Sequence, residues 1–476
     1  MKRGYSSAET AQDVAGRKIT LCQNQLVAFG KQEGQLAYVL KSIARCIAGA
    51  SLLAAAPALA RPLDDAAADN LAEIQPEQDE QVGSGTQSLP TAQSDIRKRI
   101  DALPQAPAKA APPDPVAIKL IASQFADVPV SGDADSTLRY GGKVDLYVDL
   151  KGSAFGLDDS IKLHFHPEFK YGESANGTVG LIPSNTQLFY PGEGEVFDLS
   201  INVTKTWQSG TSLTVGKVNV LDIATQLPVA GGGGHEGFQN LAMALPPSAI
   251  VPGSITGALL NIPTEKALFR LWVFDPELQS RKTGFESPFD KGVGFLGSVT
   301  FPVKIDGRRG YYAIKLAGST RSEVAAEALP AALVPPPGSA FGNRKGEFSA
   351  VLAFAQFITE YDDAPGKGIG IFGQVYVSNG DPTFLDRSGF IGIAGNPRFR
   401  PQDKFGIAYF RYSLTDSLID VLSGRLALET EDGIEAFYTY GLSDRFRLTA
   451  DVQVVDSAVS ARDVGVIAGM RLTASF

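Results

Sequence analysis

Apolar and polar residues alternate in short runs along most of the chain after about residue 136. The run 143–151 reads KVDLYVDLK, in which the even-numbered positions are all apolar and the odd-numbered ones are mostly charged. Residues 162–171, 197–206, 446–454 and 464–476 alternate in the same way. A period of two is that of a β-strand with one apolar and one polar face. The pattern therefore predicts an all-β chain.

Two runs depart from simple alternation. The run Ser212–Leu221 (SLTVGKVNVL) changes parity near Gly216, which predicts a β-bulge at that point. The run Phe405–Leu414 has apolar residues on both faces and includes Arg411, so its pattern does not say which face is apolar.

The beginning of the chain has a different character. Residues 41–60 combine Lys41 and Arg45 with a short, alanine-rich apolar run that closes on Ala-Leu-Ala, which is the pattern of a secretory signal peptide. We therefore expect residues 1–60 to be a signal peptide with an atypical N-terminal extension. Residues 61–130, rich in Ala, Pro and acidic side chains, are expected to form a disordered periplasmic leader, and residues 131–476 the folded domain.

Composition narrows the function classes. The formal net charge of −9 and the pI of about 5.1 argue against nucleic-acid binding. No apolar stretch of about 20 residues follows the one near the start, which argues against a helical membrane protein. Both cysteines, Cys22 and Cys46, precede the expected cleavage point. The processed chain would then lack disulfides, thiolate metal sites and a catalytic cysteine.

A transmembrane antiparallel β-barrel and a soluble β-sandwich both produce alternating strands. The number of runs, the aromatic residues at strand ends and the secretion signal without cysteines favour the barrel. About fifteen candidate strands lie between residues 137 and 476, whereas bacterial barrels use an even number, so one strand is missed or wrongly split. The last run ends on Phe476, and outer-membrane proteins resemble this in ending on an aromatic residue that their assembly machinery reads.

Three stretches together resemble the carbohydrate-selective porins, the OprB family. Residues 215–246 lead from a Gly-Lys strand through Leu-Asp and a glycine-rich segment to Phe-Gln-Asn, and residues 368–410 contain an Asn-Gly-Asp-Pro turn and an Arg-Pro-x-Asp turn. Residues 431–476 contain Asp-Gly-x-Glu, Leu-Thr-x-Asp-x-Gln and the closing strand. The resemblance implies sixteen antiparallel strands in the outer membrane of a Gram-negative bacterium and passive diffusion of sugars. His164-Phe165-His166 and the four glycines at 231–234 are not part of that pattern.

A sugar in a narrow channel must exchange water for hydrogen bonds and aromatic contacts from the wall. Arg270 and Trp272 share one parity and suit a saccharide, although an interfacial aromatic belt is an equal alternative for Trp272. Glycines allow residues 229–245 to fold inward as a constriction loop. Inward parity adds further pore-lining candidates: Lys143, Asp145, Asp149, Lys162, His164, His166, Glu168, Asp198, Glu435, Arg447, Asp451 and Arg471.

Three of these candidates raise the question of a metal site. His164, His166 and Glu168 lie on one strand face, with about 7 Å between successive side chains. The sequence shows no fourth convergent donor and contains only 3 histidines in all. We therefore expect neither a metal nor a cofactor.

The expected function is a carbohydrate-selective porin, not an enzyme, with sugars, outer-membrane lipid and the barrel-assembly machinery as partners, and with oligomerisation open. One alternative is a porin for other small polar or anionic solutes. Another is a secreted β-rich carbohydrate-binding module or enzyme. No Ser-His-Asp order stands out in the sequence, and paired carboxylates are too common to identify a glycosidase.

Overall fold

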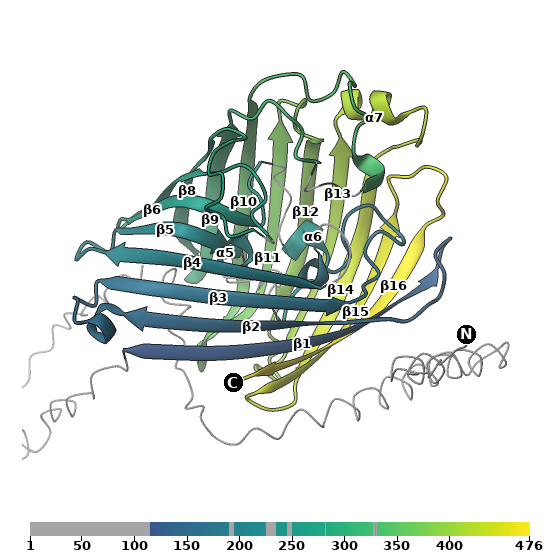
Figure 1. The fold of residues 1–476 in the computed structure, drawn as a ribbon. Helices are drawn as coiled ribbons and strands as arrows, with labels where there is room; N and C mark the ends of the chain where they lie inside the picture. The colour runs from purple at the N-terminus through teal and green to yellow at the C-terminus, as the bar shows by residue number, and fades with distance from the viewer. Residues whose placement is uncertain are drawn as a thin grey trace, which may run out of the picture. The chain divides into compact units, whose positions relative to one another are not determined.

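Sixteen antiparallel strands close into one barrel in the computed structural model (Figure 1). The structure describes residues 115–189, 195–224, 235–244, 250–280, 282–326, 329 and 331–476. The expected signal peptide and residues 61–114 of the expected leader lie outside the described residues. The strands are β1 Val116–Ser131, β2 Arg139–Lys151, β3 Ile161–Gly172, β4 Val196–Thr206, β5 Ser212–Asn219, β6 Ser254–Pro263, β7 Leu268–Phe274, β8 Gly294–Ile305, β9 Arg308–Ser319, β10 Glu347–Tyr361, β11 Ala364–Ser378, β12 Leu385–Gly395, β13 Lys404–Leu414, β14 Glu431–Gly441, β15 Phe446–Asp456 and β16 Gly465–Ser475.

Each strand pairs with its neighbours in sequence, and β1 pairs with β16 to close the wall. Ile121 lies opposite Ser475, and Phe125 lies opposite Arg471. Closure leaves no unpaired edge, which a sheet in lipid requires because no water is available to satisfy free backbone groups. The all-β barrel of sixteen strands predicted from the sequence is thereby confirmed.

The first strand begins earlier than the sequence pattern indicated. β1 spans Val116–Ser131, so the wall starts before residue 131, where we placed the boundary of the leader. Its composition explains the difference, because β1 carries three alanines and Pro129 and so resembles the Ala- and Pro-rich segment that precedes it. β1 is therefore the strand that was missing from the odd number of candidate strands counted between residues 137 and 476.

The two faces of the wall differ as the alternation predicts. Exposed apolar side chains lie on the outer face, and the buried polar side chains lie on the inner one. On β13, Ile407, Tyr409 and Arg411 are exposed while Ala408 and Phe410 are buried, which orients the strand that the sequence did not. On β5, Gly216 has φ of 136°, a backbone conformation that favours glycine, at the position where the parity changes. The pairing with β6 runs through Gly216 without a register shift, so the predicted β-bulge is wrong and the backbone conformation of the glycine changes the parity instead.

The helices are short. They are α5 Val220–Ala224, α6 Leu241–Ala244 and α7 Asp416–Leu422, with single 3₁₀ turns at Gly152–Phe155, Thr186–Leu188 and Ala331–Leu333. Among the described residues, no helix has the length and apolar character needed to cross a bilayer.

Part of the chain between β5 and β6 folds into the barrel. We call its described residues 235–244, which include α6, the inward segment. Its Phe238 and Met243 belong to a buried apolar cluster with Phe372, Phe410 and Phe437 from the strands. Residues 235–244 of the loop predicted at 229–245 therefore fold inward as predicted, whereas 229–234 and 245 lie outside the described residues.

Candidate functional site

A side chain of strand β14 holds the main chain of the inward segment. Both oxygens of the Glu435 carboxylate accept hydrogen bonds, from the amide nitrogen of Gln239 at 2.5 Å and from that of Asn240 at 3.0 Å. From β16, the Arg471 guanidinium donates to the carbonyl oxygen of Gly237 at 2.8 Å. Glu435 and Arg471 are both fully buried. Two wall side chains of opposite charge therefore fix successive peptide groups of the segment.

An aromatic contact holds the centre of the inward segment. The Phe238 ring lies 4.8 Å from the Phe437 ring at 82° and 5.5 Å from the Phe372 ring, measured between ring centroids. A Cβ atom at Gly406 would lie 2.7 Å from Cζ of Phe238, so this position on β13 must remain without a side chain for the ring to fit. Edge-to-face pairs of this kind stabilise beyond the area that they bury.

Charged groups hold the start of the same segment. Glu236 pairs with Arg447 on β15 and, at 3.8 Å, with Lys404 on β13. Burial alone would raise the pKa of Glu236, but Lys404 and Arg447 together hold it below its usual range. The pKa of its neighbour His235 is also lowered, to about 4, but here the cause is burial, which disfavours the charged imidazole. Glu236 is therefore ionised and His235 neutral near pH 7.

A second stretch, between β3 and β4, is fixed in the same manner. Glu431 accepts hydrogen bonds from the amide nitrogens of Leu181 at 2.6 Å and Ile182 at 2.8 Å. It also accepts one from Ala458 at 3.1 Å. Glu431 and Glu435 lie on the same face of β14, four positions apart, so one strand holds two separate segments by their main chains.

A ladder of buried charges covers the inner face of β2 and β3. The ammonium of Lys143 lies 3.0 Å from Asp145 and 2.6 Å from Glu168, and Lys170 lies 2.8 Å from Glu168. Nearby, Lys217 contacts Asp198 at 2.5 Å. Because these charges are paired and buried, they satisfy one another and offer little to a passing solute.

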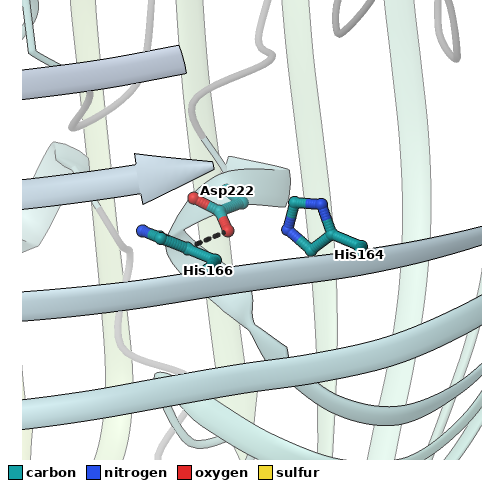
Figure 2. A group of neighbouring side chains, drawn as sticks. All are labelled: His164, His166 and Asp222. Carbon is teal, nitrogen blue, oxygen red and sulfur yellow. Dashed lines mark hydrogen bonds and ion pairs between the residues drawn. The ribbon is translucent and has the colours of Figure 1, made fainter. Parts of the chain in front are cut away.

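All three histidines of the chain gather beside this ladder. His166 places Nδ1 at 2.8 Å from Asp222 (Figure 2). The other nitrogen of His166, Nε2, lies 2.8 Å from Asp145, and Nδ1 of His164 lies 2.7 Å from Asp149. His235, from the inward segment, places Nε2 at 3.7 Å from Asp145. Asp222 belongs to α5, and no motif in the sequence indicated that this helix would return to β3.

A different surface lines β6 to β9. Asn261, Arg270, Ser298 and Lys315 occupy matching register positions on four successive strands, and we call them the polar row. All four side chains are half-buried. The Arg270 guanidinium reaches Oγ1 of Thr300 at 3.4 Å. Within the described part of the chain, neither Arg270 nor Lys315 has a carboxylate within ion-pair distance.

The structure brings the sequence-predicted residues to one side of the wall but not to one site. All lie on the inner face, and they divide by accessibility. Arg270, Asp149, Lys162, His164 and Arg447 remain partly exposed. The others are buried: Trp272, Lys143, Asp145, His166, Glu168, Asp198, Glu435, Asp451 and Arg471.

Trp272 points inward, as its parity with Arg270 suggested, rather than into an outer aromatic belt. It is only 6% exposed and packs with Val218, Ile255, Leu259 and Phe274. Its ring therefore has little free face for a sugar. Three residues that complete the polar row were missed because the sequence alone does not give the register between strands: Asn261, Ser298 and Lys315.

Comparisons with known proteins give a family match and structural neighbours. The family model of the carbohydrate-selective porins, OprB family, matches residues 135–476. The high-pH structure of Pseudomonas putida OprB is similar to the chain with a TM-score of 0.63 at 17% identity, covering 76% of this chain and 94% of that one. The low-pH structure of Pseudomonas putida OprB gives 0.45 at 12% identity, covering 76% and 92%. A comparison with curated protein sequences gave no match.

Proposed function

The chain belongs to the carbohydrate-selective porins of the OprB family, and on this premise we propose that sugars cross its lumen along the polar row of β6 to β9. It is an outer-membrane porin with a closed wall of sixteen antiparallel strands. We infer that monosaccharides or small oligosaccharides diffuse passively along this path, and that the chain acts as a channel and not as an enzyme.

The two accessible cations of the polar row carry this proposal. Most other charges of the inner face are paired with each other or hold an inward stretch, whereas Arg270 and Lys315 meet no carboxylate among the described residues. A guanidinium and an ammonium donate to sugar hydroxyls, and Asn261 and Ser298 add groups that both donate and accept. Two donors on an open wall bind weakly, which a diffusion channel needs for release.

Replacing both Arg270 and Lys315 by alanine is expected to slow the influx of a neutral sugar. We expect roughly a two- to tenfold decrease at low sugar concentration, since a hydrogen bond to a charged group contributes about 1.5–3 kcal/mol and only part of this is expressed in a weak site. Swelling rates of proteoliposomes in glucose and maltose measure the effect. Arg411→Ala is the matched control, because Arg411 is exposed on the outer face. Unchanged rates for both sugars in the double variant would contradict the proposed path.

A second candidate function is passage of small anionic solutes, which the same two cations favour. Gluconate in the swelling assay separates the two, because it has the size of glucose and one negative charge. If the double variant slows gluconate while glucose keeps its rate, the polar row serves anions, and the sugar path is wrong.

We further propose that the closing strand engages the barrel-assembly machinery through Phe476. Phe476 exchanges two backbone hydrogen bonds with Leu120 of β1, at 2.8 and 2.9 Å. Its ring is 41% exposed and lies edge-on to Phe446, with 6.1 Å between ring centroids. The aromatic side chain is therefore presented at the seam where the barrel closes.

Phe476→Ala is expected to lower the amount of assembled protein in the outer membrane. Heat-modifiable gel mobility of the membrane fraction separates folded from unassembled chain. Phe446→Ala is the control, because it removes the same ring contact and leaves the aromatic side chain at 476. Equal losses in both variants would assign the effect to the ring contact and reject recognition of Phe476.

A further inference from the structure

Two imidazoles and one carboxylate converge on the inner face of β3. One ligand atom each from His164, His166 and Asp222 lie within 4.8 Å of one another. The two histidines occupy positions i and i+2 of one strand face, and α5 brings Asp222 against them (Figure 2). Figure 2 shows one ring nitrogen of His164 facing the Asp222 carboxylate. Two separate parts of the chain thus supply the group.

The other ring nitrogen of each imidazole contacts a further carboxylate. Asp149 lies 2.7 Å from Nδ1 of His164, and Asp145 lies 2.8 Å from Nε2 of His166. This leaves Nε2 of His164 and Nδ1 of His166 directed toward Asp222. Metal-binding histidines typically use their second nitrogen in this way, because a carboxylate there fixes the tautomer and the orientation of the ring.

The third donor is oriented as well. The Tyr147 hydroxyl donates to Oδ1 of Asp222 at 3.2 Å, while Oδ2 of Asp222 lies 2.8 Å from Nδ1 of His166. The Tyr147 ring stacks on His166 at 4.1 Å between centroids. All three donors are therefore fixed by neighbours.

We propose that His164, His166 and Asp222 bind a divalent cation of the zinc class. Two imidazole nitrogens and one carboxylate oxygen are a ligand set typical of Zn²⁺, whereas Mg²⁺ and Ca²⁺ prefer oxygen ligands alone. A three-residue set leaves a fourth position for water. The bound cation would join β3 to α5, the helix that precedes the glycine-rich stretch and the inward segment.

The same contacts have a simpler explanation, in which a protonated His166 lies between Asp145 and Asp222 and no cation binds. The two explanations differ in whether the purified protein takes up Zn²⁺. The measurement uses full-length protein in detergent, prepared without a polyhistidine tag and treated with a chelator. Calorimetric titration with ZnCl₂, and the visible absorption of bound Co²⁺ as a second readout, report binding.

Saturable binding of a single Zn²⁺ per chain is expected, with no uptake of Mg²⁺. Asp222→Asn and His164→Gln should abolish the Co²⁺ absorption that imidazole ligation produces. Asp149→Asn should weaken Zn²⁺ binding by about 10- to 100-fold, the usual effect of losing a carboxylate that orients a metal-bound histidine. Loss of the absorption in the first two variants and weakened binding in the third would distinguish the ligands from Asp149, which positions His164.

Two matched controls keep the test specific. His235→Gln removes the remaining histidine, which is outside the group, and Glu236→Gln weakens the docking of the inward segment without removing a ligand. Both should retain Zn²⁺ binding, and heat-modifiable mobility confirms that each variant is folded. Absence of saturable binding in the unaltered protein, or binding that folded Asp222→Asn retains at full strength, overturns the proposal.

Discussion

Phe238→Ala is expected to open the lumen and raise the single-channel conductance. Phe238 is fully buried and joins the inward segment to Phe372 and Phe437 of the wall. Truncating a buried phenylalanine costs about 3–5 kcal/mol. The hydrogen bonds from Glu435 and Arg471 remain, so the segment stays attached by its main chain but loses the apolar contact that holds its centre to the wall. The segment should then move away from the wall more often, and planar-bilayer recordings would show larger and noisier current steps.

Phe390→Ala is the matched control for this experiment. Phe390 lies on β12 and touches the same Phe372 ring, with 5.8 Å between centroids, but none of the described ring contacts joins it to Phe238. Its removal should leave the conductance near that of the unaltered channel. If Phe238→Ala folds, as heat-modifiable mobility would show, and still conducts like the unaltered channel, the inward segment does not limit the passage.

Arg471→Met is expected to lower the thermal stability of the barrel strongly. Arg471 is fully buried, and the carboxylates of Asp127, Glu435 and Asp451 all act on its charge. Methionine fills similar space but removes the buried cation and its hydrogen bonds to Gly237 and Thr449, and each buried group left unsatisfied costs about 1–3 kcal/mol. The temperature at which the folded gel band disappears should fall, and the inward segment should loosen because its bond to Gly237 is lost.

A second substitution distinguishes charge balance from packing. Adding Asp451→Asn to Arg471→Met removes one of the nearby carboxylate charges while keeping Oδ1, the oxygen that accepts from Gln453. The double variant should therefore regain part of the lost thermal stability. A double variant that is less stable than Arg471→Met alone would show that shape, and not charge, makes Arg471 necessary.

The faces of the strands were predictable from the sequence because the period of two is a local property. The alternation from Val464 to Phe476 predicted that Arg471 points into the lumen, and the parity of Arg270 and Trp272 was also right. β1 was missed for an equally local reason, since its alanines and Pro129 resemble the leader.

Convergence between distant parts of the chain was not predictable in this way. Asp222 meets His166 from 56 residues away, and Gln239 meets Glu435 from 196 residues away. These contacts depend on strand register and on the path of the inward segment, which no spacing along the chain encodes. The same reason explains why Trp272 proved to be packed, because Val218, Ile255 and Leu259, which share its buried cluster, come from β5 and β6.

Glu431 and Glu435 recognise peptide amides and not side chains, so the attachment they provide does not depend on which residues the attached stretch carries. β14 therefore carries two carboxylates that can bind the main chain of stretches with different side chains. Solute preference in such a barrel can change by substitution of the loop side chains that do not contact the wall, while Phe238 and the wall itself stay constant. Grafting a loop of different chemistry between β5 and β6, with its backbone path kept, would be a direct route to a porin with altered selectivity.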